Sequence, residues 1–503
     1  MSRRNVTFHT IRIEDIIEGV KAGTLAIPEF QRDYVWQKNK APKLLDSLLN
    51  QFPIGAILTW STDDNVESRI RTRVKSPTKW IIDGQQRTST LVKIMDGDIH
   101  LLFDVENESF LLENAATKKA MNPFHVPVSD IWGPRYTKIL KEIGDLTQIE
   151  SKARQFEDRV ASCRNLLYKE LPQIHLEGHG IDDAIQAFQR INTQGMRLKS
   201  TDIEVAELTK RHAGFVKNSV QPYLNKLKSR GWDRVYLSQL FMACEGIAED
   251  SVKSDQRKRL HDLSKSQLER SWNILTKGVD DAIEFLNDEL GIKDSGIFPS
   301  GSMLMPLAIL MSKPIKLRPD AQDLVRWMIA ASITRRYSGS SSEKLDKDIQ
   351  SCFSSNPIRS LVRNAQKDSG RSSLRANPQN FSGALHDRYG MFLTYLACRS
   401  SGMKDLFDKR QVSSSTAEWH HVIPRASIAL KHRRELDVPA NIAFILGPTN
   451  RSISNSKAES YLENIDDALL KSQCIPTDRR IWSSHKEFIK KRGLLLAKAI
   501  NEY

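Results

Sequence analysis

The chain has 503 residues, and its 75 Lys and Arg against 61 Asp and Glu give a formal net charge of +14 at pH 7. Two or three domains are expected, because the length exceeds one ordinary core. No apolar run reaches the roughly 20 residues of a membrane span, and the start lacks a signal peptide's apolar core. We therefore expect a cytoplasmic protein that does not enter the membrane, with a bias towards a polyanionic partner.

The amino-terminal part alternates helices and strands. Helical spacing predicts helices over 11–22 and 40–50, and apolar runs predict strands over 53–60 and 79–82. The second strand runs into Asp83-Gly-Gln-Gln-Arg87, where a glycine turn opens a helix and exposes backbone N–H groups to an anion. Two alternatives stay open: Thr88 only caps the helix, or Arg87 only ties two segments together through Asp83.

Helical periodicity dominates residues 145–389. Within it, residues 187–204 predict a helix, a polar turn and a second helix, which either offers Asn192, Thr193 or Lys199 to a ligand or is a well-capped junction. Arg335 and Arg336 either meet DNA phosphates or complement a helix dipole, and the second reading is favoured. Residues 367–381 suggest a linker, and 486–498 predict a closing helix.

Near the carboxyl end stand Glu418-Trp-His-His-Val-Ile-Pro424, then Asn441, and then Asn450-Arg451. Adjacent strand residues point to opposite faces, so His420 and His421 serve one site only where a strand ends, and Pro424 supplies such an end. Phosphodiester hydrolysis needs a base and a hard cation, which an imidazole and an imidazole–amide pair suit. The alternative is that the histidines merely close a strand and the asparagines occupy turns.

This pattern resembles the HNH (ββα-metal) nucleases. The resemblance implies that His421 is the general base and that Asn441, also at the catalytic centre, pins the loop between the strands. It further implies His420 and Asn450 as ligands of Mg²⁺ or another divalent cation. Arg451 and Lys457 become candidate DNA phosphate contacts, although either could be a solvated helix charge.

Two motifs in the first 90 residues, Ile27-Pro-Glu-Phe-Gln-Arg32 and Asp83-Gly-Gln-Gln-Arg87, resemble the ParB/sulfiredoxin-like NTPase domain of GmrSD-type modification-dependent restriction enzymes and the related SspE group. Residues 188–198 resemble a further stretch of that family. The resemblance implies an NTP site, for GTP or ATP, with these candidate nucleotide-binding residues: Gln31, Arg32, Asp83, Gly84, Gln85, Gln86 and Arg87.

We therefore expect an α+β, mostly helical chain with a ParB-like α/β domain over 1–145, a helical domain over 146–383 and an HNH domain over 384–503. The resemblance implies an anti-phage DNA endonuclease that nicks or cleaves modified or invading double-stranded DNA under the control of NTP hydrolysis. A homodimer would allow a nicking site to cut both strands. The alternatives are a nucleotide-switched DNA-binding protein whose ββα unit is only a clamp, and a nuclease acting on RNA.

Overall fold

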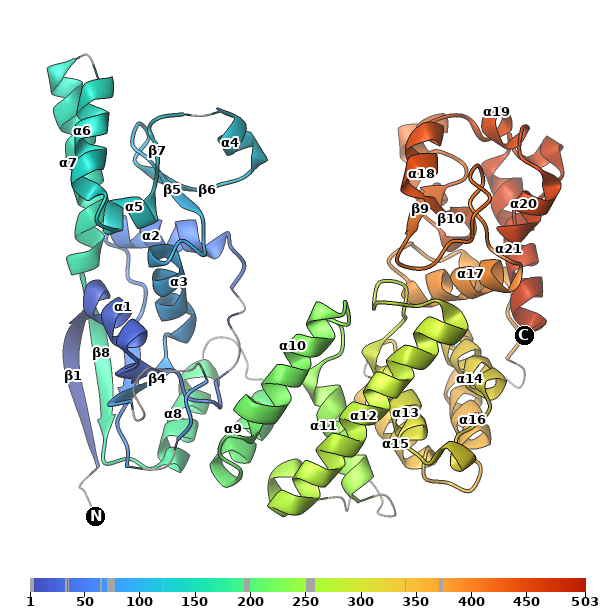
Figure 1. The fold of residues 1–503 in the computed structure, drawn as a ribbon, viewed down its shortest axis with the longest axis horizontal. Helices are drawn as coiled ribbons and strands as arrows, with labels where there is room; N and C mark the ends of the chain where they lie inside the picture. The colour runs from blue at the N-terminus through green and yellow to red at the C-terminus, as the bar shows by residue number, and fades with distance from the viewer. Residues whose placement is uncertain are drawn as a thin grey trace. The chain divides into compact units, whose positions relative to one another are not determined.

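The computed structural model describes residues 4–31, 34, 36–63, 66–69, 77–120, 122–147, 149–193, 200–249, 258–339, 341–370 and 374–503. The chain divides into two compact units, Met1–Gln221 and Pro222–Tyr503. Figure 1 labels their helices and strands. Within the described part, we find no helix that is both long and apolar enough to cross a bilayer.

A five-stranded mixed sheet is the framework of the first unit. Its strand order is β1-β8-β3-β4-β2, with β8 parallel to β3 and β4 parallel to β2. The strands are β1 (Asn5–Arg12), β2 (Leu25–Ala26), β3 (Ile57–Trp60), β4 (Lys79–Asp83) and β8 (Glu170–Glu177). A smaller sheet of order β6-β5-β7 follows, from Ser109–Leu112, Leu101–Asp104 and His125–Pro127.

Helices bury their apolar faces against these sheets. In α1, Ile13, Ile16 and Ile17 recur at helical spacing and enter the core, and Gly23 ends the helix with a φ of 84°. The helices of this unit are α1 (Ile13–Ala22), α2 (Lys40–Leu49), α3 (Gln85–Met95), α4 (Ala115–Ala120), α5 (Val128–Trp132), α6 (Tyr136–Leu146), α7 (Glu150–Asn165), α8 (Ile181–Thr193) and α9 (Ser200–Arg211).

Strand β8 is where the helical prediction for residues 145–389 is wrong. It lies in the large sheet between β1 and β3, so the first compact unit continues past residue 145 to Gln221. Its Gln173 and His175 are buried polar residues, and both side chains hydrogen-bond the Thr59 hydroxyl at 2.9 Å. A strand whose inward side chains are polar does not show apolar alternation, which explains the error.

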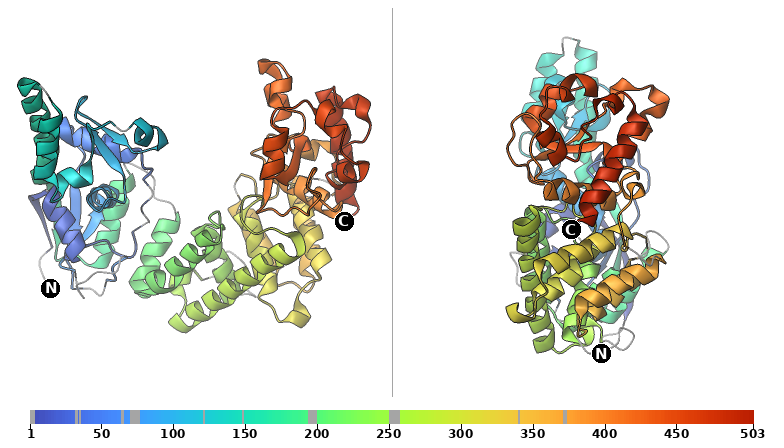
Figure 2. Two further views of the ribbon diagram at one scale, coloured as in Figure 1. Left: turned by 45° about the horizontal axis from the view of Figure 1, so that its top comes forward. Right: turned by 90° about the vertical axis from the view of Figure 1, so that its right-hand side faces the viewer.

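Among its described residues, the regular elements of the second unit are helices apart from one strand pair. Its long helix α12 (Lys265–Leu290) packs against α11 (Leu237–Ala248) and α13 (Gly301–Met311), and α17 (Arg388–Ser400) packs against α21 (His485–Asn501). Figure 2 shows the units from two further directions, with α21 in dark red at the carboxyl end. The remaining helices are α10 (Gln221–Ser229), α14 (Ala321–Ile333), α15 (Ser342–Ser351), α16 (Pro357–Ser369), α18 (Gly447–Ile453), α19 (Ala458–Leu462) and α20 (Asp467–Ser472).

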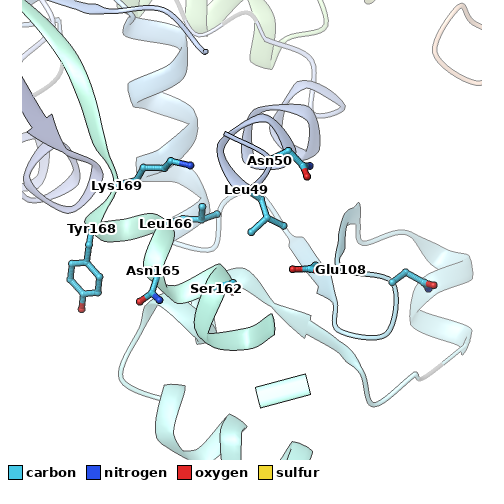
Figure 3. A pocket seen from close by; sticks show the side chains of 9 residues that line it. Leu49, Asn50, Glu108, Ser162, Asn165, Leu166, Tyr168 and Lys169 are labelled. Carbon is cyan, nitrogen blue, oxygen red and sulfur yellow. The ribbon is translucent and has the colours of Figure 1, made fainter. Parts of the chain in front are cut away.

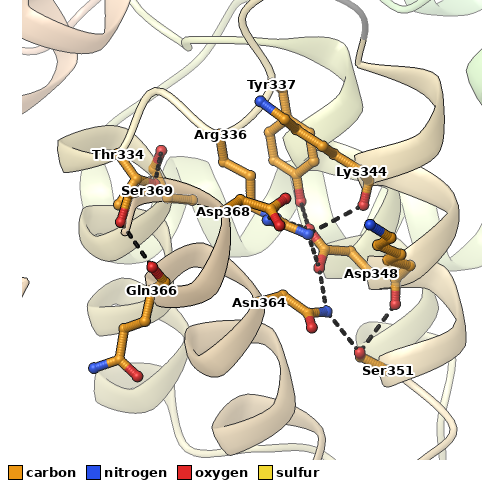
Figure 4. Close-up of polar contacts among 12 residues, drawn as sticks. Thr334, Arg336, Tyr337, Lys344, Asp348, Ser351, Asn364, Gln366, Asp368 and Ser369 are labelled. Atoms are coloured by element: carbon orange, nitrogen blue, oxygen red, sulfur yellow. Dashed lines mark hydrogen bonds and ion pairs between the residues drawn. The ribbon is translucent and has the colours of Figure 1, made fainter. Parts of the chain in front are cut away.

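A buried ion-pair network follows α14 (Figure 4). Arg336 is fully buried and forms a two-point ion pair with Asp348 of α15, with Nη2 donating to Oδ1 at 2.9 Å. The third guanidinium nitrogen, Nη1, donates to Asp368 at 2.8 Å, and Tyr337 donates its hydroxyl to Asp348 at 2.6 Å. The phosphate-binding reading of Arg336 is therefore wrong, and Arg335 is likewise paired, with Asp387.

Candidate functional site

The carboxyl-terminal motif folds as two strands and a helix. Strand β9 (Ala417–His421) pairs antiparallel with β10 (Ile442–Leu446), with His421 opposite Ile442, and α18 follows directly. The apolar β10 is almost wholly buried, so it anchors the pair in a local core that includes Val422 and Tyr461. Strand β9 ends at His421, as predicted from Pro424 nearby.

His420 reaches from β9 towards α18 and α19. Its side chain is buried, with Nδ1 2.9 Å from Oδ1 of Asn450 and Nε2 3.1 Å from the hydroxyl of Tyr461. Burial lowers the pKa of His420 to about 4, so the imidazole is neutral at physiological pH. The two residues that the sequence proposes as cation ligands are thus brought together.

The hydrogen-bond partners decide which atoms of this pair are acceptors. Tyr461 donates its single hydrogen to the Val422 carbonyl at 2.9 Å, so it accepts from Nε2–H of His420. Nδ1 then carries a lone pair. Asn450 donates its amide Nδ2 to Glu418 Oε2 at 2.8 Å, which leaves its Oδ1 facing Nδ1 of His420. In the other tautomer Tyr461 would turn its hydrogen to His420, and Val422 would lose this partner.

Two facing acceptors fit a cation that sits against both. A neutral imidazole nitrogen and an amide oxygen are ordinary ligands of divalent cations, and Tyr461 is the kind of outer partner that fixes a ligating histidine. Glu418, 48% exposed in its side chain, lies beside them and carries negative charge. The described residues contain no cluster of three or more His, Cys, Asp or Glu arranged to hold a metal, so phosphate and water would complete the coordination.

His421 is held by a different partner. Its Nε2 lies 3.1 Å from Oδ1 of Asp437, which follows the 3₁₀ segment Leu430–Leu436 (η8). Burial lowers the pKa of His421, and the hydrogen bond and charge of Asp437 oppose that shift. A neutral imidazole with one oriented nitrogen can take a proton from water. The sequence reasoning missed Asp437, because nothing in its spacing from His421 distinguishes it from other loop acids.

Asn441 organises the backbone that follows His421. Its fully buried amide accepts from Ile423 N at 2.9 Å and donates to Ile423 O at 3.0 Å and Leu436 O at 3.1 Å. These bonds join the end of β9 to the residue that precedes Asp437. The loop-pinning contacts expected of Asn441 are present, and its catalytic importance remains a proposal.

The candidate DNA contacts lie at the edge of this site. The Arg451 side chain is 73% exposed and lies 4.0 Å from Glu418, a loose ion pair that a phosphate can replace. Lys457 is exposed at the start of α19. Both are accessible to a polyanion, and their role towards DNA is a proposal.

The Asp83–Arg87 turn adopts the predicted strand–turn–helix geometry. Gly84 is the N-cap of α3 with a φ of 91°, and a Cβ at this position would lie 2.5 Å from Ile57 Cδ1, so glycine is required. Thr88 is therefore not the cap. Its buried hydroxyl finds no hydrogen-bond partner among the residues that the structure describes.

Arg87 ties several segments together. Its guanidinium donates to Ile54 O at 2.5 Å, to Ala56 O at 3.0 Å and to Asp83 Oδ2 at 3.1 Å. Burial lowers the pKa of Arg87, and Asp83 opposes that shift. The tying role considered from the sequence is thus what these contacts show, and contact with a nucleotide remains a proposal.

The other nucleotide candidates surround this turn. Gln31 is buried and donates to Ile82 O at 2.7 Å, and the Gln86 side chain accepts from Trp36 N at 3.1 Å. Gln85 is also buried. Arg32 lies outside the described residues, as does Lys199 of the segment over 187–204. The side chains of Asn192 and Thr193 are likewise not described.

A pocket of about 580 Å³ opens elsewhere in the first unit, between α2, the β5–β6 turn and the end of α7 (Figure 3). Its lining is polar and includes Asn50, Asn107, Glu108, Asn165 and Lys169. None of the described nucleotide candidates lines it. It is therefore separate from the predicted nucleotide site.

Comparison with known proteins gives a family match in the amino-terminal part and a relative that aligns over most of the chain. Residues 13–209 match the family described as GmrSD restriction endonuclease, N-terminal domain. The chain is also 22% identical over 553 aligned positions to the "Uncharacterized protein MJ0686" of Methanocaldococcus jannaschii, an alignment that covers 96% of this chain and 91% of that protein. The family match supports a relationship to GmrSD-type restriction endonucleases, and that family implies nuclease activity on DNA.

Proposed function

We propose that this protein is a divalent-cation-dependent DNA endonuclease of a restriction-type anti-phage system, with an HNH-type site at its carboxyl end. The observation that carries the proposal is the convergence of His420 and Asn450, with His421 on the next strand position and basic residues beside it. The match of residues 13–209 to a restriction endonuclease domain supports DNA as the substrate.

In this proposal each residue has a defined task. Arg451 and Lys457 bind backbone phosphates and orient the scissile bond. His421 accepts a proton from the attacking water through the ring nitrogen that Asp437 leaves free. His420 and Asn450 hold a divalent cation such as Mg²⁺, which when bound supplies Lewis-acid stabilisation of the phosphate charge.

The nucleotide part of the proposal concerns the first unit. The backbone N–H groups at the start of α3 and the buried glutamines at 85 and 86 are the groups offered to the phosphates of GTP or ATP. Nucleotide hydrolysis would then bias the nuclease between a shielded and a DNA-accessible state. Base or backbone modification of the DNA is the proposed signal.

The test is a cleavage assay on phage-type modified and unmodified plasmid with Mg²⁺ and each of the four NTPs. Wild-type protein should nick or linearise DNA. His421→Ala should lose cleavage by at least about 100-fold and keep its affinity for DNA. Cleavage that survives His421→Ala would contradict the site, and preferential cleavage of RNA would contradict the substrate. The proposed regulation of cleavage by NTP is contradicted if Arg87→Ala leaves both the cleavage rate and its response to NTP unchanged.

A further inference from the structure

Asp437 occupies a position that sets the hydrogen-bonding state of His421. Its Oδ1 lies 3.1 Å from His421 Nε2. An ionised carboxylate has no hydrogen to donate, so Nε2 must carry the hydrogen. We infer that Asp437 is a positioning residue that holds His421 in its Nε2–H tautomer and leaves the Nδ1 lone pair free for the substrate water.

The backbone around Asp437 is fixed at several points. Its N–H donates to Arg434 O at 3.2 Å, and its carbonyl accepts from Leu385 N at 3.0 Å. The preceding carbonyl, of Leu436, accepts from the buried amide of Asn441. A carboxylate on such a restrained segment orients an imidazole better than one on a freely rotating loop, because less conformational entropy is lost on bonding.

The cationic side chain of Arg425 also lies near the Asp437 carboxylate. Arg425 Nε lies 3.5 Å from the same Oδ1 of Asp437, and its side chain is 53% exposed. The shorter distance from Oδ1 to His421 makes the imidazole the better hydrogen-bond partner. Arg425 remains accessible to a DNA phosphate, and binding of that phosphate would leave the carboxylate to His421 alone.

The catalytic meaning of this arrangement rests on the proposed nuclease function. As the water oxygen bonds to phosphorus, its O–H bond breaks and the proton moves to Nδ1, while the P–O bond to the leaving oxygen breaks and that oxygen keeps the electron pair and takes a proton from solvent. The resulting imidazolium is stabilised by the Asp437 carboxylate. In this arrangement Asp437 acts through His421 and not on the phosphate, so its removal should lower turnover more than substrate affinity.

The experiment compares full-length wild type with Asp437→Ala, Asp437→Asn and the control Glu435→Ala. Glu435 hydrogen-bonds His432 and His485, so the control breaks a carboxylate–histidine contact of the same kind in the adjacent segment. Two quantities are measured: kcat and KM for plasmid nicking, and the tautomer of His421 by long-range ¹⁵N–¹H spectra of histidine-labelled protein. His421→Ala assigns its resonances and serves as the cleavage-negative reference.

We expect the Nε2–H tautomer in the wild type and in Glu435→Ala, and mixed tautomers in Asp437→Ala. The kcat of Asp437→Ala should fall by about 10- to 100-fold, with KM within two-fold of the wild type. The kcat of Asp437→Asn should fall less, because the amide oxygen still accepts a hydrogen bond from His421. An unchanged tautomer or an unchanged kcat in Asp437→Ala overturns the inference. If neither the wild type nor any variant cleaves DNA, the proposed function fails. The tautomer of His421 measured by the ¹⁵N–¹H spectra then decides the role of Asp437 by itself.

Discussion

Nδ1 of His420 and Oδ1 of Asn450 lie 2.9 Å apart, although 30 residues separate them in sequence. Tyr461 occupies the other imidazole nitrogen, and Glu418 accepts from the Asn450 amide nitrogen, so in the Nε2–H tautomer of His420 the two facing atoms are both acceptors. In the proposed site a bound cation would relieve the repulsion of their lone pairs.

Arg451→Ala and Lys457→Ala should each weaken binding to duplex DNA about equally for all sequences. Each should also reduce the slope of log affinity against log salt by about 1, because each removes one phosphate contact. Fluorescence anisotropy between low and moderate salt measures the slope. Arg480→Ala is the control, because Arg480 is an exposed arginine paired with Asp478. If the Arg451→Ala slope equals that of Arg480→Ala, Arg451 does not contact DNA.

Gly84→Ala should destabilise the first unit more than Gly97→Ala. Both glycines have positive φ, of 91° and 78°, so both substitutions incur a left-handed backbone penalty of about 1 kcal/mol. Only the Cβ at 84 meets a neighbour, Ile57, whereas nothing lies within 4 Å of a Cβ at 97. Urea unfolding followed by circular dichroism measures the difference. Equal losses would show that the turn before α3 relaxes freely.

Asp348→Ala should destabilise the second unit by about 3–5 kcal/mol, since it leaves Arg336 buried without its principal partner. Asp368 remains within reach of one guanidinium nitrogen and limits the loss. Differential scanning calorimetry gives the shift in melting temperature. Glu343→Ala, an exposed acid in the first turn of the same helix, is the control and should change little. A loss of similar size in both variants would argue against a special role for the buried pair.

Acid should weaken the β5–β6 turn through Asp104. Burial raises the pKa of this carboxyl, but bonds from Asn107 and Glu106 and the neighbouring His125 together hold the pKa below its ordinary value of 3.8. The unfolded chain therefore binds a proton more readily, so the stabilisation is present above pH 3.8 and is lost as pH falls towards the folded value.

In Asp104→Asn the stability of the first unit should depend less on pH between about 5 and 2. Hydrogen exchange of the β5 and β6 amides, compared at several pH values, reports on this turn. Asp98→Asn, which removes an exposed acid paired with Lys93, is the control. A pH dependence unchanged from the wild type would mean that other carboxyls dominate acid unfolding here.

Local patterns predicted the elements whose apolar spacing is regular. These include α1, α2 and α21, as well as the strand–turn–helix at Asp83 and the β9–β10–α18 unit. The residues of the carboxyl-terminal site were predicted from the resemblance of the His420-His421, Asn441 and Asn450 pattern to the HNH nucleases. Their geometry bears out the proximity of His420 and Asn450.

Sequence could not show contacts that depend on distant partners. Strand β8 was missed because its inward Gln173 and His175 are satisfied by Thr59, more than 100 residues earlier. Asp437 lies after a basic segment, and only the fold brings it to His421. Arg336 is a basic residue at a helix end in sequence, and its burial depends on acids from two later helices.

Cation binding by the full-length protein is the most direct test of the central claim. Isothermal titration with Mn²⁺, in the presence of DNA and with His421→Ala to prevent turnover, should show one site in the second unit. Adding Asn450→Ala to this variant should weaken the affinity for Mn²⁺ by about 10- to 100-fold, while adding Glu435→Ala should leave the affinity unchanged. If Mn²⁺ does not bind, or binds equally well without Asn450, the facing atoms of His420 and Asn450 are not a cation site.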